Sequence, residues 1–194
     1  MARRGLAADQ KKGRVTQASV VFLDESGFML QPLVRRTWAP RGQTPIHYSW
    51  DRHDRLSVIA ALTLPPERHR IGLYFDVHDH NIHAENVVSF VRALHRQLRR
   101  PIILICDRLN VHRSAVKTLL IAGSPWLQVE WLPAYAPDLN PVEALWSHTK
   151  YSDLANFLPD DVQHLESAVV ESLCDQYYEQ QLKRSFFQAA ELEL

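Results

Sequence analysis

One short run of apolar residues constrains the fold of this chain more than any other feature. Residues 102–106 read Ile-Ile-Leu-Ile-Cys, and Pro101 precedes them. A strand that is exposed on one face alternates apolar with polar residues, so an unbroken run of branched apolar residues indicates burial on both faces. Such strands lie at the centre of sheets that carry helices on both sides. We therefore expect an α/β domain built around a strand at residues 102–107.

The segments on either side of this run predict a mixed sheet. Before it come short apolar segments that read as strands, at residues 20–24, 46–50, 56–64 and 71–76. Helical patterns predict helices at residues 84–99, 113–122 and 141–150, and one or two more over residues 160–175 and 178–192. A last strand is predicted at residues 127–132. Early strands without helices between them favour antiparallel pairing, and the later alternation favours parallel strands with crossover helices.

Length and composition are those of one ordinary globular domain. The chain has 194 residues, of which 46% are hydrophobic and 23% charged. No apolar run reaches the roughly 18 residues that a membrane span needs, so we expect no membrane partner. Residues 1–18 are expected to be a basic N-terminal tail and residues 19–194 the folded domain. The two cysteines, Cys106 and Cys174, fall in predicted elements, which indicates buried, reduced thiols in a cytoplasmic protein.

The charges cancel in sum but are unevenly distributed along the chain. A formal net charge of zero argues against tight stand-alone binding to nucleic acid. However, residues 1–14 and 35–70 are rich in arginine and lysine, whereas the chain beyond Asp153 is acidic. Such a distribution gives either one face suited to a polyanion or a solvated surface of mixed charge.

Two carboxylates are the last residues of predicted strands. Asp24 ends the strand at 20–24, and Asp107 ends the strand at 102–107. The end of a central strand in an α/β sheet is where ligand sites concentrate. Each residue also has a structural alternative: Asp24 as a turn residue bonding Ser26 or Gly27, and Asp107 as a cap for the next helix.

A third carboxylate, Glu143, begins the helix predicted at 141–150. Asn140 suits the N-cap and Pro141 the first helical position, so Glu143 falls at the third position of a capping box. Its alternative role is therefore a hydrogen bond back to the Asn140 backbone. If the three acids meet at one edge of the sheet, they suit Mg²⁺ or Mn²⁺, which prefer carboxylate and water ligands. Two such ions about 4 Å apart can activate an attacking oxygen and stabilise a leaving one.

A histidine-rich segment offers a second candidate metal site. His78, His80 and His83 lie within six residues of one another, but structural zinc sites more often include cysteine, and none is near. We expect a polar loop here.

The three acidic segments resemble those of a known family. Asp24-Glu25-Ser26-Gly27-Phe28, Asp107 with His112 five residues on, and residues 135–143 (Tyr-Ala-Pro-Asp-Leu-Asn-Pro-Val-Glu) with Trp146 and Lys150 look like the three motifs of DDE transposases. The similarity is to the bacterial insertion sequence 630 group of the mariner superfamily. Asp107 and Glu143 are separated by 35 residues, close to the short gap usual there. The resemblance runs from about Val20 to Lys150.

This resemblance implies a fold, a chemistry and partners. The fold would be ribonuclease H-like, with a mixed five-stranded sheet flanked by helices on both faces. Asp24, Asp107 and Glu143 would be the catalytic residues and would hold two Mg²⁺ or Mn²⁺ ions, with His112 and Asn140 as accessory residues. The chain would cut transposon ends and join them to target DNA, at a TA dinucleotide, as a homodimer on the bacterial nucleoid.

The sequence departs from the family at its start. Such transposases begin with helix-turn-helix domains, and the residues before Ser19 are too few for them. We expect a separate end-binding domain or subunit, and the chain reads as an excised domain, a split-gene product or a remnant. The alternative functions are a catalytically silent DNA- or protein-binding remnant, or another ribonuclease H-like nuclease. The latter usually adds a fourth carboxylate, for which Glu25, Asp76 and Asp138 are candidates.

Overall fold

The computed structural model describes residues 17–46, 48, 54–134 and 136–192, and its centre is a sheet of five strands. The strands are β1 (Ser19–Met29), β2 (Arg55–Leu64), β3 (Gly72–His78), β4 (Ile102–Cys106) and β5 (Leu127–Trp131). They lie in the order β3-β2-β1-β4-β5. β1, β2 and β3 pair antiparallel, whereas β4 is parallel to both β1 and β5. The predicted mixed five-stranded sheet is confirmed.

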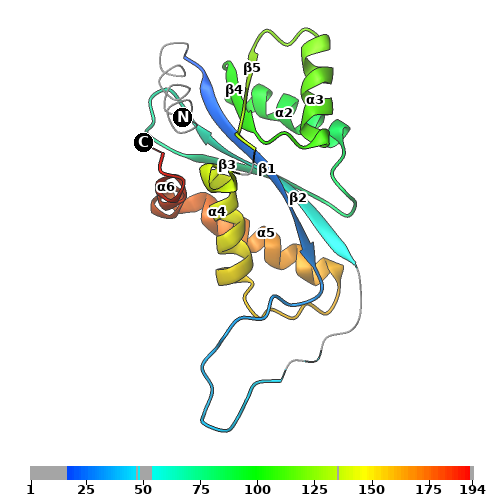
Figure 1. Cartoon of the computed structure of the whole chain (residues 1–194), viewed down its shortest axis with the longest axis vertical. Helices are drawn as coiled ribbons and strands as arrows, with labels where there is room; N and C mark the ends of the chain where they lie inside the picture. The colour runs from blue at the N-terminus through cyan, green and yellow to red at the C-terminus, as the bar shows by residue number, and fades with distance from the viewer. Residues whose placement is uncertain (1–16, 47, 49–53, 135, 193–194) are drawn as a thin grey trace.

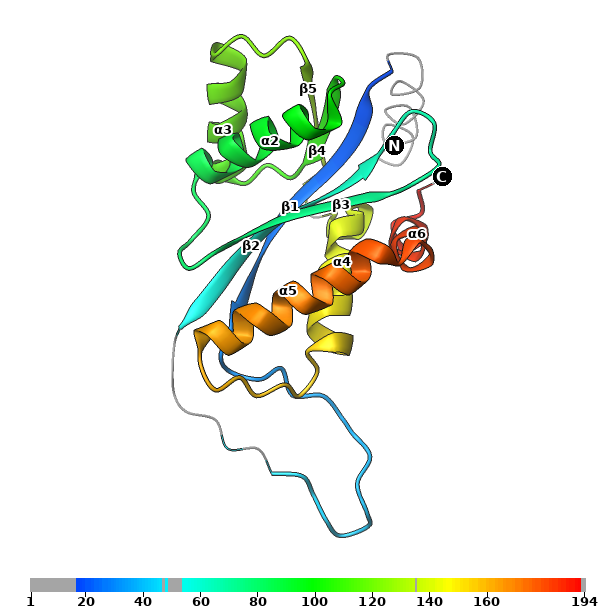
Figure 2. The same cartoon turned by 180° about the vertical axis from the view of Figure 1, so that it is seen from behind.

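Helices cover both faces of this sheet (Figures 1 and 2). One face carries α2 (Ala84–Leu98) and α3 (Asn110–Ile121). The other carries α4 (Pro141–His148), α5 (Val162–Tyr178) and α6 (Gln180–Ala189). A 3₁₀ turn, η1 (Pro137–Leu139), precedes α4, and a π-helical turn, η2 (Thr149–Asp153), follows it. In the described part of the chain no helix combines the length and apolarity needed to cross a bilayer.

Alternation along the central strands divides the apolar residues into two cores. In β1, Val20 and Phe22 face α4–α6, whereas Val21 and Leu23 face α2 and α3. All five residues of β4 are buried and divide between the same two cores. The two-sided burial predicted from residues 102–106 is therefore confirmed.

Several predicted boundaries were wrong. The first strand does not end at Asp24 but continues to Met29, because β2 pairs with it as far as Arg55. The helix predicted from 113 begins at Asn110, so His112 lies in its first turn. The α-helix predicted to reach residue 150 ends at His148, where the backbone widens into η2.

The segment between β1 and β2 also differs from expectation. Residues 30–46 leave the body of the molecule at one end (Figure 1) and are mostly exposed. Of the strand predicted at 46–50, Ile46 and Tyr48 are not in a strand, and the remaining positions lie outside the described residues. Residues 1–16 of the predicted tail lie outside them as well. Cys106 is buried as expected, but Cys174 is exposed because it lies on the outer side of α5.

The C-terminal helices are part of the core. Phe187 of α6 is fully buried, and its ring meets that of Phe22 edge-on at a centroid distance of 5.6 Å. We expect Phe187→Ala to lower the free energy of unfolding by about 3–5 kcal/mol through lost burial and a residual cavity. Urea unfolding followed by circular dichroism measures this loss. Tyr178→Ala, at a residue 76% exposed, is the control; equal effects of the two substitutions would contradict the packing of α6 on β1.

Candidate active site

Strand pairing places Asp24 and Asp107 next to each other. The parallel register of β1 and β4 runs to Phe22 opposite Ile105, and both acids lie two residues further on. Two residues preserve the face of a strand, so Asp24 lies on the face of Phe22, which α4–α6 cover. Asp24 itself is within β1, opposite Ala60 of β2. The alternative that Asp24 is a turn residue is therefore wrong.

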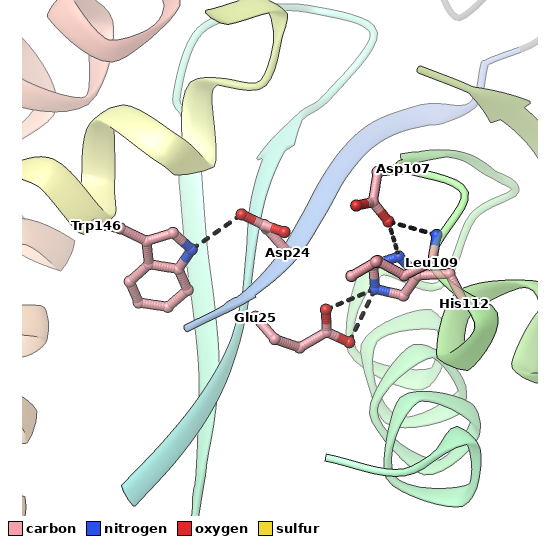
Figure 3. Close-up of polar contacts among 6 residues, drawn as sticks. All are labelled: Asp24, Glu25, Asp107, Leu109, His112 and Trp146. Carbon is pink, nitrogen blue, oxygen red and sulfur yellow. Dashed lines mark hydrogen bonds and ion pairs between the residues drawn. The ribbon is translucent and has the colours of Figure 1, made fainter. Parts of the chain in front are cut away.

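Asp24 is a buried carboxylate with little to neutralise it. Its side chain is 8% exposed, and its Oδ2 accepts a hydrogen bond from the Trp146 indole at 3.2 Å (Figure 3). Burial, followed by the nearby charges of Glu143 and Glu25, raises the pKa of Asp24 from 3.8 to about 7. A carboxylate whose ionised form is this unfavourable is suited to receive a cation.

The start of α4 brings Glu143 to the same acids. Asn140 caps the helix, because its Oδ1 accepts a hydrogen bond from the Val142 amide at 3.2 Å. Burial is the first cause of the raised pKa of Glu143, the Lys150 ammonium opposes it, and Asp107 adds to it. Glu143 also borders a cleft of about 770 Å³ that reaches Asp138 and Asn140.

The capping-box role for Glu143 is wrong. The Asn140 amide, which would receive the Glu143 side chain, donates instead to the Pro137 carbonyl at 2.8 Å. The turn η1 therefore satisfies that donor and leaves the Glu143 carboxylate exposed beside the cleft. Asn140 is 5% exposed and acts here by fixing the start of α4.

Asp107 is held by a histidine that bridges it to β1. His112 Nδ1 lies 2.6 Å from Asp107 Oδ1, and His112 Nε2 lies 2.7 and 2.8 Å from the two Glu25 oxygens. The Leu109 amide also donates to Asp107 Oδ1 at 3.0 Å, but Leu109 is itself the N-cap residue and no side chain caps α3, so the helix-cap alternative for Asp107 is wrong. Figure 3 shows Asp24 and Glu25 leaving β1 on different sides, toward Trp146 and His112 respectively.

The position of His112 between two carboxylates favours its charged form. The side chain is 1% exposed, and burial alone would lower the pKa of the imidazole. The hydrogen bonds and charges of Glu25 and Asp107 outweigh burial and raise this pKa to about 9. His112 is thus a cation that compensates Asp107 and fixes its orientation.

Two of the three candidates for a fourth carboxylate at the site have other partners. Glu25 is turned to His112, and Asp76 lies within 3.4 Å of His78 on β3. Asp138 contributes to the raised pKa of Glu143 and is the one candidate on that side. Sequence reasoning missed the Glu25–His112 contact because its partners are 87 residues apart.

The donor chemistry fits divalent cations, although the acids are not drawn into a closed ligand set. In the described residues, no three His, Cys, Asp or Glu side chains converge as a group that could hold an ion, and this includes the histidines at 78–83. Glu143 and Asp107 are nevertheless near enough to raise the pKa of Asp24, and Asp107 is near enough to raise that of Glu143. A cation is the partner that would relieve this mutual repulsion. A site shared by all three requires side-chain movement from the positions described.

The fold is that of a ribonuclease H-like domain, and acidic residues lie beside its central strands. The chain belongs to the DDE superfamily endonucleases, whose family profile matches residues 19–166. A search of curated proteins gives no match.

Solved structures of Mos1 transposase share this fold. They include the paired-end complex with the left transposon end, at 18% identity and a TM-score of 0.65, covering 97% of this chain and 56% of that chain. The Mos1 mariner paired-end complex with Mn matches at 17% identity and a TM-score of 0.66, covering 98% and 57%. The Mos1 strand transfer complex matches at 18% identity and a TM-score of 0.59, with the same coverage. The chain thus spans less than three fifths of the Mos1 chains.

The raised pKa of Asp24 predicts a pH-dependent cost in stability. Since its folded pKa of about 7 exceeds the ordinary 3.8, the folded state binds the proton more tightly, and stability falls as pH rises between these values. We expect Asp24→Asn to raise the free energy of unfolding near pH 8 and to change it little near pH 4. Urea unfolding at both pH values measures this, with Asp79→Asn, at an exposed position, as the control. An equal effect at both pH values would contradict the burial of an ionised Asp24.

The Glu25–His112 pair stabilises the folded protein, in contrast to the buried Asp24. Its stabilisation is fully present below the ordinary pKa of 6.5 and is lost as pH rises through about 9. We therefore expect Glu25→Gln to destabilise the protein more near pH 6 than near pH 10. NMR titration of the His112 ring should show a midpoint that falls in this variant. The exposed Glu85→Gln is the control, and an unchanged midpoint in Glu25→Gln would show that the pair does not set the histidine charge.

Proposed function

We propose that this chain is the catalytic domain of a DDE transposase, which cuts DNA strands and transfers the cut ends to target DNA. Asp24, Asp107 and Glu143 are the catalytic residues in this proposal. One observation carries it: β1, β4 and α4 bring these three acids, from distant parts of the sequence, close enough for Glu143 and Asp107 to raise the pKa of Asp24 and for Asp107 to raise that of Glu143. Membership of the DDE superfamily endonucleases supports it.

The three acids would hold two Mg²⁺ or Mn²⁺ ions, which supply an activated attacking oxygen and a stabilised leaving oxygen in phosphodiester chemistry. The rest of the chain orients the acids. Trp146 holds Asp24 by one oxygen, and the Leu109 amide and His112 hold Asp107 by one oxygen. In the described contacts Asp107 thus keeps its Oδ2 for a ligand.

Lys150 adds a positive group beside the acids. Burial lowers the pKa of its ammonium, whereas Glu143 and Asp24 act against that shift, so the charges face one another. The ammonium lies 5.2 Å from the centre of the Phe28 ring, which limits its reach to this side of the site. Lys150 is therefore placed to meet an anionic group that approaches Asp24 and Glu143.

The finer assignments follow from the sequence motifs and from Mos1. We propose membership of the insertion sequence 630 group, action at TA targets, pairing as a dimer on DNA, and a separate helix-turn-helix domain or subunit for end recognition. Paired-end and strand transfer complexes of Mos1, including structures with Mn and Mg, support DNA and a divalent cation as partners. Such a protein would act on DNA in the bacterial cytoplasm, at the nucleoid.

The experiment is Mn²⁺- or Mg²⁺-dependent nicking of supercoiled plasmid, together with joining of a pre-cut DNA end that carries a free 3′-hydroxyl. We expect Asp107→Ala and Glu143→Gln to abolish both reactions, by about 10³-fold or more, because removal of a metal-holding carboxylate takes away charge stabilisation of the transition state.

The matched control is Asp79→Asn, which removes an exposed carboxylate away from these three and should retain activity. Loss of activity in the control would contradict the assignment of the three acids. Folded wild-type protein without metal-dependent activity, even with a helix-turn-helix half added, would overturn the proposal in favour of a silent remnant. Cleavage of an RNA–DNA hybrid in preference to DNA would favour the other nuclease class.

A further inference from the structure

The fold separates charges that cancel in the sequence. Residues 84–122, which form α2, β4 and α3, carry seven arginine and lysine residues against two acidic residues. Residues 160–192, which form α5 and α6, carry seven acidic residues against two basic ones. The helices of these two groups cover opposite faces of the sheet (Figure 2). A protein with zero net charge therefore has one basic and one acidic side. We call the acidic residues of the second group the acidic layer: Asp160, Asp161, Glu166, Glu171, Asp175, Glu179 and Glu191.

Six cations of the α2–α3 side are exposed and unneutralised. Their side chains make no hydrogen bond, ion pair or ring contact with any described residue. We call them the basic layer: Arg92, Arg96, Arg99, Arg108, Arg113 and Lys117. By contrast, Arg100 at the end of α2 pairs with Glu67 at 3.1 Å. The basic layer thus consists of the charges that the described fold leaves without a partner.

The spacing of these cations is unfavourable for the isolated helices. Arg92 and Arg96 on α2, and Arg113 and Lys117 on α3, are like charges four residues apart, which repel. Arg113 also lies in the first turn of α3, which contains no acidic residue and where the helix dipole disfavours a cation. Helix stability therefore does not account for this arrangement, whereas an anionic partner does.

The basic layer begins directly beside Asp107 of the candidate site. Arg108 directly follows Asp107, and α3 starts two residues later at Asn110. Arg113 and Lys117 lie about 5 and 11 Å further along the α3 axis, at a rise of about 1.5 Å per residue. α2 packs against α3 through their apolar faces, so the arginines of α2 extend the same layer.

We propose that the basic layer binds the phosphate backbone of double-stranded DNA on one side of the reacting phosphodiester. The inference rests on the proposed function, since it assigns the flank of that same site. Duplex DNA carries one charge per about 1.7 Å of axis, so a layer of this length meets several phosphates. Arginine, which makes up most of the layer, matches phosphate oxygens in bidentate geometry. Contacts to the backbone position the duplex without reading its sequence.

The test measures binding to a duplex of about 30 base pairs and arbitrary sequence, by fluorescence anisotropy between about 50 and 200 mM salt. The variants are R113Q/K117Q and R92Q/R96Q/R99Q in the full chain. We expect weaker binding, and a slope of log affinity against log salt that falls by about one for each phosphate contact removed. Unchanged thermal unfolding establishes that the variants are folded.

The matched control is R36Q/R41Q, which removes two exposed cations from the segment between β1 and β2. It should change the affinity and the salt slope less than R113Q/K117Q does. Equal losses in the two double variants, or unchanged slopes in the variants of the basic layer, would overturn the proposal.

Two further measurements separate this inference from the proposed function and from another occupant. Binding measured without a divalent cation does not require strand cleavage, so weakened DNA binding by the layer variants would stand even if the wild-type chain cuts no DNA. Active protein whose layer variants bind DNA normally would overturn the inference alone.

Sedimentation at low salt tests whether the basic layer pairs with the acidic layer of a second copy. Self-association lost in R113Q/K117Q, with DNA binding retained, would assign the layer to that copy instead.

Discussion

The candidate site depends on the parallel pairing of β1 with β4. Their register ends with Phe22 opposite Ile105, and the same offset continued by two residues brings Asp24 beside Asp107. Because side chains alternate, β1 presents Asp24 to the face that α4 covers, where Glu143 lies, whereas Asp107, one residue beyond β4, is held by His112 of α3. A slip of one residue would send Asp24 to the opposite face and separate it from Glu143. The apolar residues of β1 and β4, buried on both sides, exclude that slip.

The same alternation gives the neighbouring acids of β1 different tasks. Asp24 faces α4 and shares a buried region with Glu143, which raises its pKa and costs stability near neutral pH. Glu25 faces α3 and pairs with His112, which stabilises the fold over the same range. The stability lost by burying Asp24 is thus offset by the ion pair that the next residue forms on the other side of the sheet. The acids of the site thus keep an unfavourable charge, as expected where they bind a group that the fold itself does not supply.

The sequence predicted what local pattern decides and failed where distant partners decide. β4 was predictable because all five of its residues are apolar, and Glu143 at the start of a helix was predictable from Asn140 and Pro141. The extension of β1 through Gly27 was not, since these residues are typical of a turn and become strand through pairing with β2. The bridge from Glu25 to His112 joins residues 87 apart in sequence. Asp107 and His112 are only five residues apart, but no local pattern indicates that His112 also binds Glu25.

Net charge describes the sequence but not the distribution of charge in the folded chain. Charge summed along a chain takes no account of distance, whereas salt screens interactions beyond about 8–10 Å. The acidic residues on α5 and beside α5 and α6 therefore do little to neutralise cations across the sheet on α2 and α3. Three carboxylates at one edge would by themselves repel a phosphate, and the cations within screening range on that edge, Arg108 and Lys150, act against this repulsion from its two sides. In this way a chain without net charge can present a positive surface directly beside an acidic site.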